Sequence, residues 1–217
     1  MNNSKTIWFA TSNEAKIQQF QYVCDKLNSG FVVKSVYKNF NIPKYEENGI
    51  SALDIAVKGA VFLFEKIKVP LVTEDSILIV QNLNNEPGLF SNKYLKEKGR
   101  TGLIDELRGT ENRAAKIISA AAFIDENKIV YPFITSILGN ISENERWNPG
   151  PGWVTPNGKK DSDDYNHFGG GFNAIFQPFG SILTLAEMTA DDHFIYGYRE
   201  PNFIEIIKFL AMKNEKR

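Results

Sequence analysis

The sequence is poor in several features that would point to particular classes of protein. It has one cysteine, Cys24, so no internal disulfide can form, and the amphipathic stretch around Cys24 favours a buried apolar role for the thiol. Its 25 basic and 26 acidic residues nearly balance, without the Lys and Arg excess that nucleic-acid binding needs. No apolar run reaches the roughly 18 residues of a membrane span, and no export signal is visible. We therefore expect a cytoplasmic protein that binds neither nucleic acid nor membrane.

Other absences bear on chemistry. The chain has only two histidines, His167 and His193, and neither stands near residues that would complete a catalytic triad. Covalent catalysis is therefore disfavoured, and we expect His193 at a surface-exposed helix end. The glycine patterns of a Walker loop and of a Rossmann fingerprint are also missing.

The apolar pattern that is present alternates between strands and helices. Helical spacing predicts helices over 14–27, 50–67, 103–107 and 202–212. Strands are expected over 6–10, 31–37, 71–80, 114–125, 129–138 and 172–179, although the three alanines at 120–122 would also suit a helix. The segment 148–171 is rich in proline and glycine, which predicts an irregular functional loop or a disordered one.

The first fragment that carries chemistry is T-S-N-E-A-K at 11–16, where a strand meets a helix. Thr11, Ser12 and Asn13 lie at the helix N-terminus, where backbone N–H groups and the helix dipole favour an anion such as phosphate. Lys16 is one turn into the helix and can reach back to the same anion. The alternative is that Ser12 or Asn13 only caps the helix.

The second fragment is Glu74-Asp75-Ser76, within the apolar run 71–80. Magnesium is typically held by one or two carboxylates together with phosphate oxygens, so this acidic pair suits a magnesium site that binds a phosphorylated ligand. Acidic residues beside a strand can equally be solvated turn residues. A further pair, Glu46-Glu47, precedes a predicted helix, where acidic charge is favourable in any case.

Taken in order, these pieces resemble the inosine triphosphate pyrophosphatase family, house-cleaning enzymes that act on non-standard purine nucleoside triphosphates. The family pattern T-G-N-x-x-K corresponds to 11–16, its E-E pair to 46–47, and D-D-S-G-L to E-D-S-I-L at 74–78. The most specific match is A-P-G-x-x-S-A-R-Y, which reads E-P-G-L-F-S-N-K-Y at 86–94. Near the end, A-E-L-T reads A-E-M-T at 186–189, so the similarity covers nearly the whole chain.

The resemblance implies a fold and an activity. It implies one α/β domain over 1–217, with an elongated central mixed β-sheet flanked by helices and two lobes that enclose an active-site cleft. It further implies a homodimer that hydrolyses a nucleoside triphosphate to the monophosphate and pyrophosphate with Mg²⁺, or with Mn²⁺ in its place. Attack at phosphorus within a polyanion needs charge neutralisation and a positioned water more than a protein nucleophile, which agrees with this chemistry.

Carried over by position, the resemblance also implies roles for individual residues. Asp75 and Lys16 would be catalytic, with Asp75 as the base that activates water. The phosphates and the metal would then be held by two overlapping sets of side chains: Thr11, Ser12, Asn13, Lys16 and Ser76 for phosphate, and Glu47, Glu74 and Asp75 for metal.

The sequence departs from the family pattern where the base is read. The family's F-G-[YW]-D reads G-G-F-N at 170–173, its S-H-R reads G-Y-R at 197–199, and its lysine after A-E-L-T falls at His193. The candidates for base binding are therefore Phe172, Asn173, Tyr198 and Arg199. Replacing the aspartate by Asn173 exchanges an acceptor-only group for one that also donates, which would alter the preferred base edge. Phe172 and Tyr198 could stack on a base or simply pack in the core.

Three functions remain open on these grounds. The main prediction is hydrolysis of a non-standard purine nucleoside triphosphate. The first alternative is a pyrophosphatase for another modified nucleotide or a pyrimidine nucleotide. The second is a nucleotide-binding protein without turnover, because Glu74 and Ile77 replace family residues beside the expected metal site.

Overall fold

The computed structural model describes residues 5–148 and 171–215. The segment 148–171, expected to be irregular, therefore lies outside the described residues except for its two ends. The chain divides into two compact units. The first unit contains residues 1–76, 119–135 and 199–217, and the second contains 77–118 and 136–198. Among the described residues, no helix combines the length and the apolar character needed to cross a membrane.

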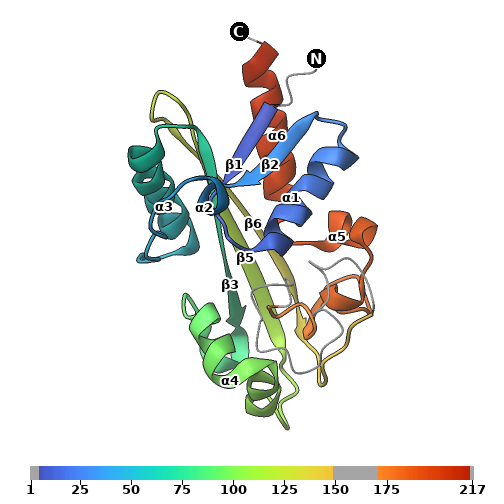
Figure 1. Ribbon diagram of the computed structural model, residues 1–217. Coiled ribbons are helices and arrows are strands. Elements are labelled where there is room, and N and C mark those ends of the chain that lie inside the picture. Colours follow the sequence, from blue (N-terminus) through green and yellow to red (C-terminus); the bar gives the residue numbers. More distant parts are fainter. Residues whose placement is uncertain (1–4, 149–170, 216–217) are drawn as a thin grey trace. The chain divides into compact units, whose positions relative to one another are not determined.

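A mixed β-sheet forms the centre of the fold (Figure 1). Its strand order is β2-β1-β3-β5-β6-β7, with β4 paired to β3. β1 pairs in parallel with β2 and β3, whereas the pairs β3–β4 and β6–β7 are antiparallel. The predicted α/β class with a mixed sheet is thus confirmed. The strands are β1 Lys5–Phe9, β2 Phe31–Ser35, β3 Leu71–Val80, β4 Pro87–Gly88, β5 Ala114–Ile124, β6 Val130–Ile141 and β7 Phe176–Pro178.

Helices cover both faces of the sheet in the first unit. Phe9 of β1 contacts Phe20 and Phe203 at ring-centroid distances of 5.5 and 5.8 Å, and these two rings stack at 4.1 Å. The neighbouring Trp8, which points to the other face because strand side chains alternate, packs against a cluster that includes Leu63. The helices of this unit are α1 Glu14–Lys26, α2 Val36–Asn39, α3 Ala52–Ile67 and α6 Glu200–Glu215.

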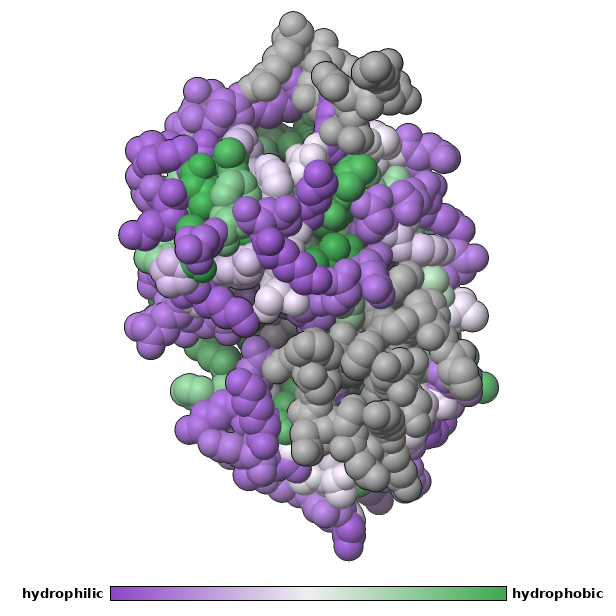
Figure 2. All heavy atoms as spheres, viewed as in Figure 1, coloured by the Kyte–Doolittle hydropathy of each residue, from purple (hydrophilic) through white to green (hydrophobic). Residues whose placement is uncertain are grey.

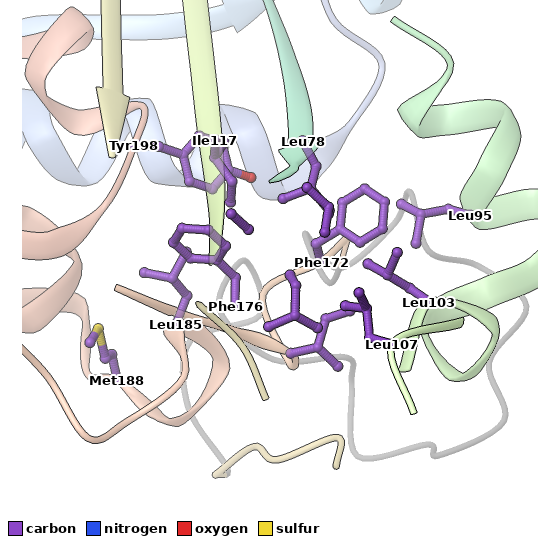
Figure 3. Packing of buried hydrophobic residues seen from close by; sticks show 14 residues of the cluster. Leu78, Leu95, Leu103, Leu107, Ile117, Phe172, Phe176, Leu185, Met188 and Tyr198 are labelled. Atoms are coloured by element: carbon purple, nitrogen blue, oxygen red, sulfur yellow. The ribbon is translucent and has the colours of Figure 1, made fainter. Parts of the chain in front are cut away.

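The second unit has a hydrophobic core of its own. Figure 3 shows this core, in which the ring of Phe172 lies between Leu78 and Leu95. Leu103 and Leu107 complete the same side of the cluster and are fully buried. The helical elements of this unit are η1 Gln81–Leu83, α4 Ser91–Glu106, η2 Leu185–Glu187 and α5 Ala190–Tyr196.

The elements agree best with the sequence where apolar periodicity is strong. β3 has the predicted bounds, and the acidic pair lies within a continuous strand instead of interrupting it. The alanine run 120–122 belongs to β5 and is fully buried, so its helical alternative is wrong. Of the strand expected over 172–179 only β7 forms, because Phe172 accepts backbone hydrogen bonds from Ile175 and Phe176 in a turn.

Hydrophilic side chains dominate the visible surface of the described residues. On the face in Figure 2, hydrophobic residues occur as smaller areas between them. This distribution fits the even mixture of acidic and basic residues in the sequence.

Candidate functional site

The loop between β1 and α1 is ordered by its own side chains. The Thr11 Oγ1 accepts a hydrogen bond of 3.1 Å from the backbone N–H of Asn13. The Asn13 Oδ1 in turn caps α1 by accepting from the N–H groups of Ala15 and Lys16, at 2.9 and 3.4 Å. The capping alternative is therefore observed for Asn13. Ser12 is exposed at the tip of this loop.

Glu74 is the centre of a buried ion cluster in the first unit. Its side chain has no exposed surface, and its Oε2 lies 2.8 Å from the Lys16 Nζ and 3.1 Å from the Arg199 Nε. Arg199 also donates from Nη2 to the Ser76 Oγ at 2.9 Å. Glu74 and Ser76 point to one face of β3 because side chains alternate along a strand. Arg199 therefore bridges two side chains of the same strand face.

A second set of hydrogen bonds holds the other carboxylate oxygen of Glu74. The Ser119 Oγ of β5 donates to the Glu74 Oε1 at 2.9 Å. The Asn202 amide of α6 donates to both the carbonyl and the hydroxyl oxygen of Ser119, at 3.0 and 3.1 Å. Glu74 thus receives hydrogen bonds on both carboxylate oxygens.

The two neighbouring carboxyl groups of β3 have opposite electrostatic environments. Burial acts to raise the pKa of Glu74, but the charges of Arg199 and Lys16 outweigh it and lower this pKa from 4.5 to about 2. For Asp75, burial dominates, and the charges of Glu47 and Glu74 add to it, so the pKa rises from 3.8 to about 7 despite Lys16. Glu74 is therefore a permanent anion, and Asp75 exchanges its proton near neutral pH.

Asp75 faces the side of β3 opposite to Glu74, toward α3. It lines a small cavity of about 40 Å³ together with Glu47 and Thr73. A cavity of this size has room for a water molecule or a partly hydrated ion. The acidic lining of this cavity and the repulsion between the carboxylates of Glu47 and Asp75 both favour a cation there.

The donor set suits magnesium in part. Glu47 and Asp75 supply two carboxylates, which is typical of a magnesium site completed by water and substrate phosphate. Within the described residues, no group of three acidic, histidine or cysteine side chains is arranged to hold a metal alone. Glu74 fits this role poorly, because both of its oxygens already accept hydrogen bonds from Ser119, Lys16 and Arg199.

The residues predicted to bind the base do not share one environment. Phe172 and Tyr198 belong to the buried hydrophobic cluster of the second unit, with 7% and 6% of their surface exposed (Figure 3). Asn173 is 2% exposed, and its backbone carbonyl oxygen accepts a hydrogen bond of 3.0 Å from the Ala186 N–H. Arg199 belongs to the first unit, beside Glu74. The core-packing alternative thus describes Phe172 and Tyr198, and their base-binding role stays a prediction.

The expected position of His193 is wrong. Its side chain is buried, with 1% of the residue exposed, and its Nε2 lies 2.7 Å from the Leu185 carbonyl oxygen. The Thr189 capping box starts α5, and His193 of this helix contacts the first residue of η2. The sequence lacked a strong apolar pattern in this short helix, so its buried face could not be identified.

Sequence reasoning also missed the supporting residues. Ser119 and Asn202 are polar residues on the buried faces of a largely apolar strand and helix. Gln19 and Glu200 form a similar pair, in which the Gln19 Nε2 donates to the Glu200 Oε1 at 2.6 Å. The signal in the sequence was a polar residue at a position where the apolar pattern predicts a buried side chain. Such a residue indicates a buried hydrogen bond, because a buried polar group needs a partner.

Comparison with known proteins identifies relatives along most of the chain. The family model described as the Ham1 family matches residues 7–200. The chain is 31% identical over 196 residues to a dITP/XTP pyrophosphatase of Saccharolobus solfataricus, covering 87% of this chain and 92% of that protein. It is 32% identical to a dITP/XTP pyrophosphatase of Borreliella burgdorferi, covering 73% and 85%.

Solved structures support the fold. The Ham1 protein of Staphylococcus aureus superposes with a TM-score of 0.72 at 19% identity, covering 96% of this chain and all of that one. A HAM1 protein from Coxiella burnetii gives a TM-score of 0.71 at 21% identity, covering 96% and 99%.

Proposed function

The chain belongs to the Ham1 family, and we propose that it hydrolyses a non-standard purine nucleoside triphosphate to the monophosphate and pyrophosphate. Its relatives are dITP/XTP pyrophosphatases, so the chain is an enzyme that hydrolyses phosphoric anhydride bonds. The substrate class that we propose, a deaminated purine nucleotide, is carried over from the names of these relatives. The same proposal includes magnesium as cofactor, a homodimer and a cytoplasmic location.

One observation supports this reaction above the others. Lys16, at the start of α1, contacts Glu74, and its charge also acts to lower the pKa of Asp75, so one cation beside the loop 11–13 influences both carboxyl groups of β3. A cation in this position suits a polyanion whose phosphates reach the loop while the scissile linkage lies near Asp75.

The residues of the site have separate tasks in the proposed reaction. Lys16 and Ser76 bind phosphate oxygens, and the loop of Thr11 and Ser12 binds the end of the phosphate chain. Asp75 accepts the proton of the attacking water, whose oxygen bonds to the α-phosphorus as pyrophosphate leaves with the electrons of the broken P–O bond. A magnesium ion held by Glu47 and Asp75 would supply charge neutralisation on the phosphates.

The pKa of Asp75 fits the role of a base. In the metal-free protein it is raised to about 7, which is close to the optimum for proton transfer at neutral pH. A cation held beside Glu47 would favour the ionised form of the Asp75 carboxylate, which is the form that accepts a proton.

Pyrophosphate release tests the proposal. The purified protein with magnesium is incubated with a panel of nucleoside triphosphates of inosine, xanthosine, deoxyuridine and the standard bases. We expect release from inosine or xanthosine triphosphate, and loss of that release in the Asp75→Asn variant. Release from a pyrimidine instead would support the first alternative, and magnesium-dependent binding without any product would support a non-catalytic nucleotide-binding protein.

A further inference from the structure

The side chains around Glu74 form an inner buried set and an outer accessible set. Glu74 has no exposed side-chain surface and Arg199 only 9%. Lys16 keeps 20% of its side chain exposed, and Ser76 is half-buried. Solvent, and hence a phosphate group, therefore reaches Lys16 and Ser76 more readily than the inner pair.

Hydrogen-bond direction fixes what the Ser76 hydroxyl does. The Arg199 guanidinium has donors only, so the 2.9 Å contact makes the Ser76 Oγ the acceptor. The hydroxyl hydrogen of Ser76 is then directed away from Arg199 and serves an acceptor elsewhere. A phosphate oxygen is such an acceptor, and it offers no hydrogen that would compete.

The direction of the hydrogen bonds at Ser119 can be assigned in the same way. Because the Asn202 amide donates to the Ser119 Oγ, the hydroxyl hydrogen of Ser119 is given to the Glu74 Oε1. Glu74 is thereby anchored on one oxygen, and its other oxygen contacts Lys16 and Arg199. A single fixed anion thus holds two cations that come from α1 and from the residue that precedes α6.

We propose that Glu74 and Arg199 are positioning residues of the phosphate site. Glu74 holds Lys16 and Arg199 side by side, and Arg199 orients the Ser76 hydroxyl to donate to a phosphate oxygen. The proposal rests on the function proposed above, and it moves Arg199 from the base end of the substrate to the phosphate end. It also gives Glu74 a role toward cations of the protein in place of metal binding.

Inorganic tripolyphosphate tests this assignment, because it has the phosphates and lacks the base. Its magnesium-dependent binding is measured calorimetrically for native protein, Ser76→Ala, Arg199→Lys and the double variant. Lysine keeps the charge and can pair with Glu74, but it lacks the planar fork that spans Glu74 and Ser76. We expect each single change to weaken binding about tenfold, the loss typical of one hydrogen bond to a charged group. The double variant should be within about twofold of Ser76→Ala alone, because Arg199 acts through Ser76. Losses that multiply in the double variant would overturn the proposal.

Two variants separate the charge of Glu74 from its shape. Glu74→Asp keeps the anion and is the residue of the family pattern, whereas Glu74→Gln keeps the length and removes the charge. We expect tripolyphosphate affinity within about threefold of native for Glu74→Asp and at least about tenfold weaker for Glu74→Gln. Thermal unfolding of each variant shows that it is folded. Native affinity in a folded Glu74→Gln protein would show that Glu74 does not position the cations.

The dependence of kcat/KM on the base shows whether Arg199 acts on the phosphates or on the base. If Arg199 serves the phosphates, Arg199→Lys lowers kcat/KM by the same factor for dITP, XTP and dUTP. If the reduction in kcat/KM differs between these nucleotides by more than about threefold, Arg199 contacts the base and the proposal is wrong. The tripolyphosphate cycle is informative even without turnover, so an inactive native enzyme would contradict the proposed function and leave this inference separately testable.

Discussion

Replacing Asp75 with asparagine should stabilise the metal-free protein at pH 8 while it abolishes catalysis. Burial raises the pKa of Asp75 from 3.8 to about 7, and the charges of Glu47 and Glu74 add to this. Folding therefore disfavours the ionised carboxylate, which is the form that the proposed reaction needs. Functional groups often reduce stability in this way.

The sign and size of this change in stability follow from the difference in proton binding between the folded and the unfolded chain. Between about pH 4 and pH 7 the unfolded chain releases the Asp75 proton while the folded chain keeps it, so stability falls as the pH rises through this window. A shift of this size corresponds to about 4 kcal/mol at pH 8. Asparagine does not ionise, but replacing one buried carboxyl oxygen by an amide NH₂ group lowers stability by roughly 1–3 kcal/mol, because an acceptor becomes a donor. We expect a net gain of about 1–3 kcal/mol at pH 8 and none at pH 5.

Urea unfolding at pH 5 and pH 8, with a chelator present, measures this difference. Glu47→Gln should give a smaller gain in the same direction, because it removes one of the charges that raise the pKa of Asp75. Asp105→Asn, at a side chain that is 51% exposed, is the matched control and should change little. The reasoning is refuted if Asp75→Asn is less stable than native protein at pH 8. Magnesium should stabilise the native protein and not this variant.

Three further changes test the packing around the site. Glu74→Gln should lower stability by about 3 kcal/mol at pH 7, because it leaves Arg199, which is buried, and Lys16 without their counter-ion. The native contribution of Glu74 is present above pH 4.5 and is lost as the pH falls toward the folded pKa of about 2, so the stabilities of the two proteins in urea unfolding should converge in acid. Gly139→Ala should cost about 2 kcal/mol or more, since its Cβ would overlap the Gln177 carbonyl of β7, and faster hydrogen exchange in β7 would report it. Phe203→Ala should cost about 3–5 kcal/mol in urea unfolding by emptying the ring stack with Phe20, and a loss below about 1 kcal/mol would contradict that packing.

The sequence predicted most elements whose apolar pattern is regular and missed those whose pattern is weak. The strand 71–80 was predicted to the residue, and α1 and α3 differ from their predicted bounds by one and two residues. The first part of α4 was missed because only Leu95 is a buried hydrophobic residue before the kink at Gly99. Gly99 has a positive φ of 65°, so the periodicity on its two sides belongs to two separate helices.

The aromatic residues at the predicted base-binding positions show a different limit. Motif position suggested that Phe172 and Tyr198 stack on a base, and composition could equally assign them to the core. Only tertiary packing distinguishes these cases, because a ring that faces a nucleotide and a ring that faces Leu78 have the same sequence signature. The structure places both rings among buried aliphatic side chains.

The candidate phosphate and metal residues were each predicted from local pattern, but the contacts between them could not be. Lys16, Glu74 and Arg199 are far apart in sequence, and their meeting depends on the pairing of β1 with β3 and on the start of α6. The family pattern has an aspartate at position 74 and S-H-R at 197–199. Here the longer Glu74 carboxylate contacts the only arginine that remains of that signature. If Glu74 and Ser76 hold Arg199 at the phosphates, the carboxylate at position 74 and the arginine at position 199 work as one unit, and neither local pattern alone could have shown it.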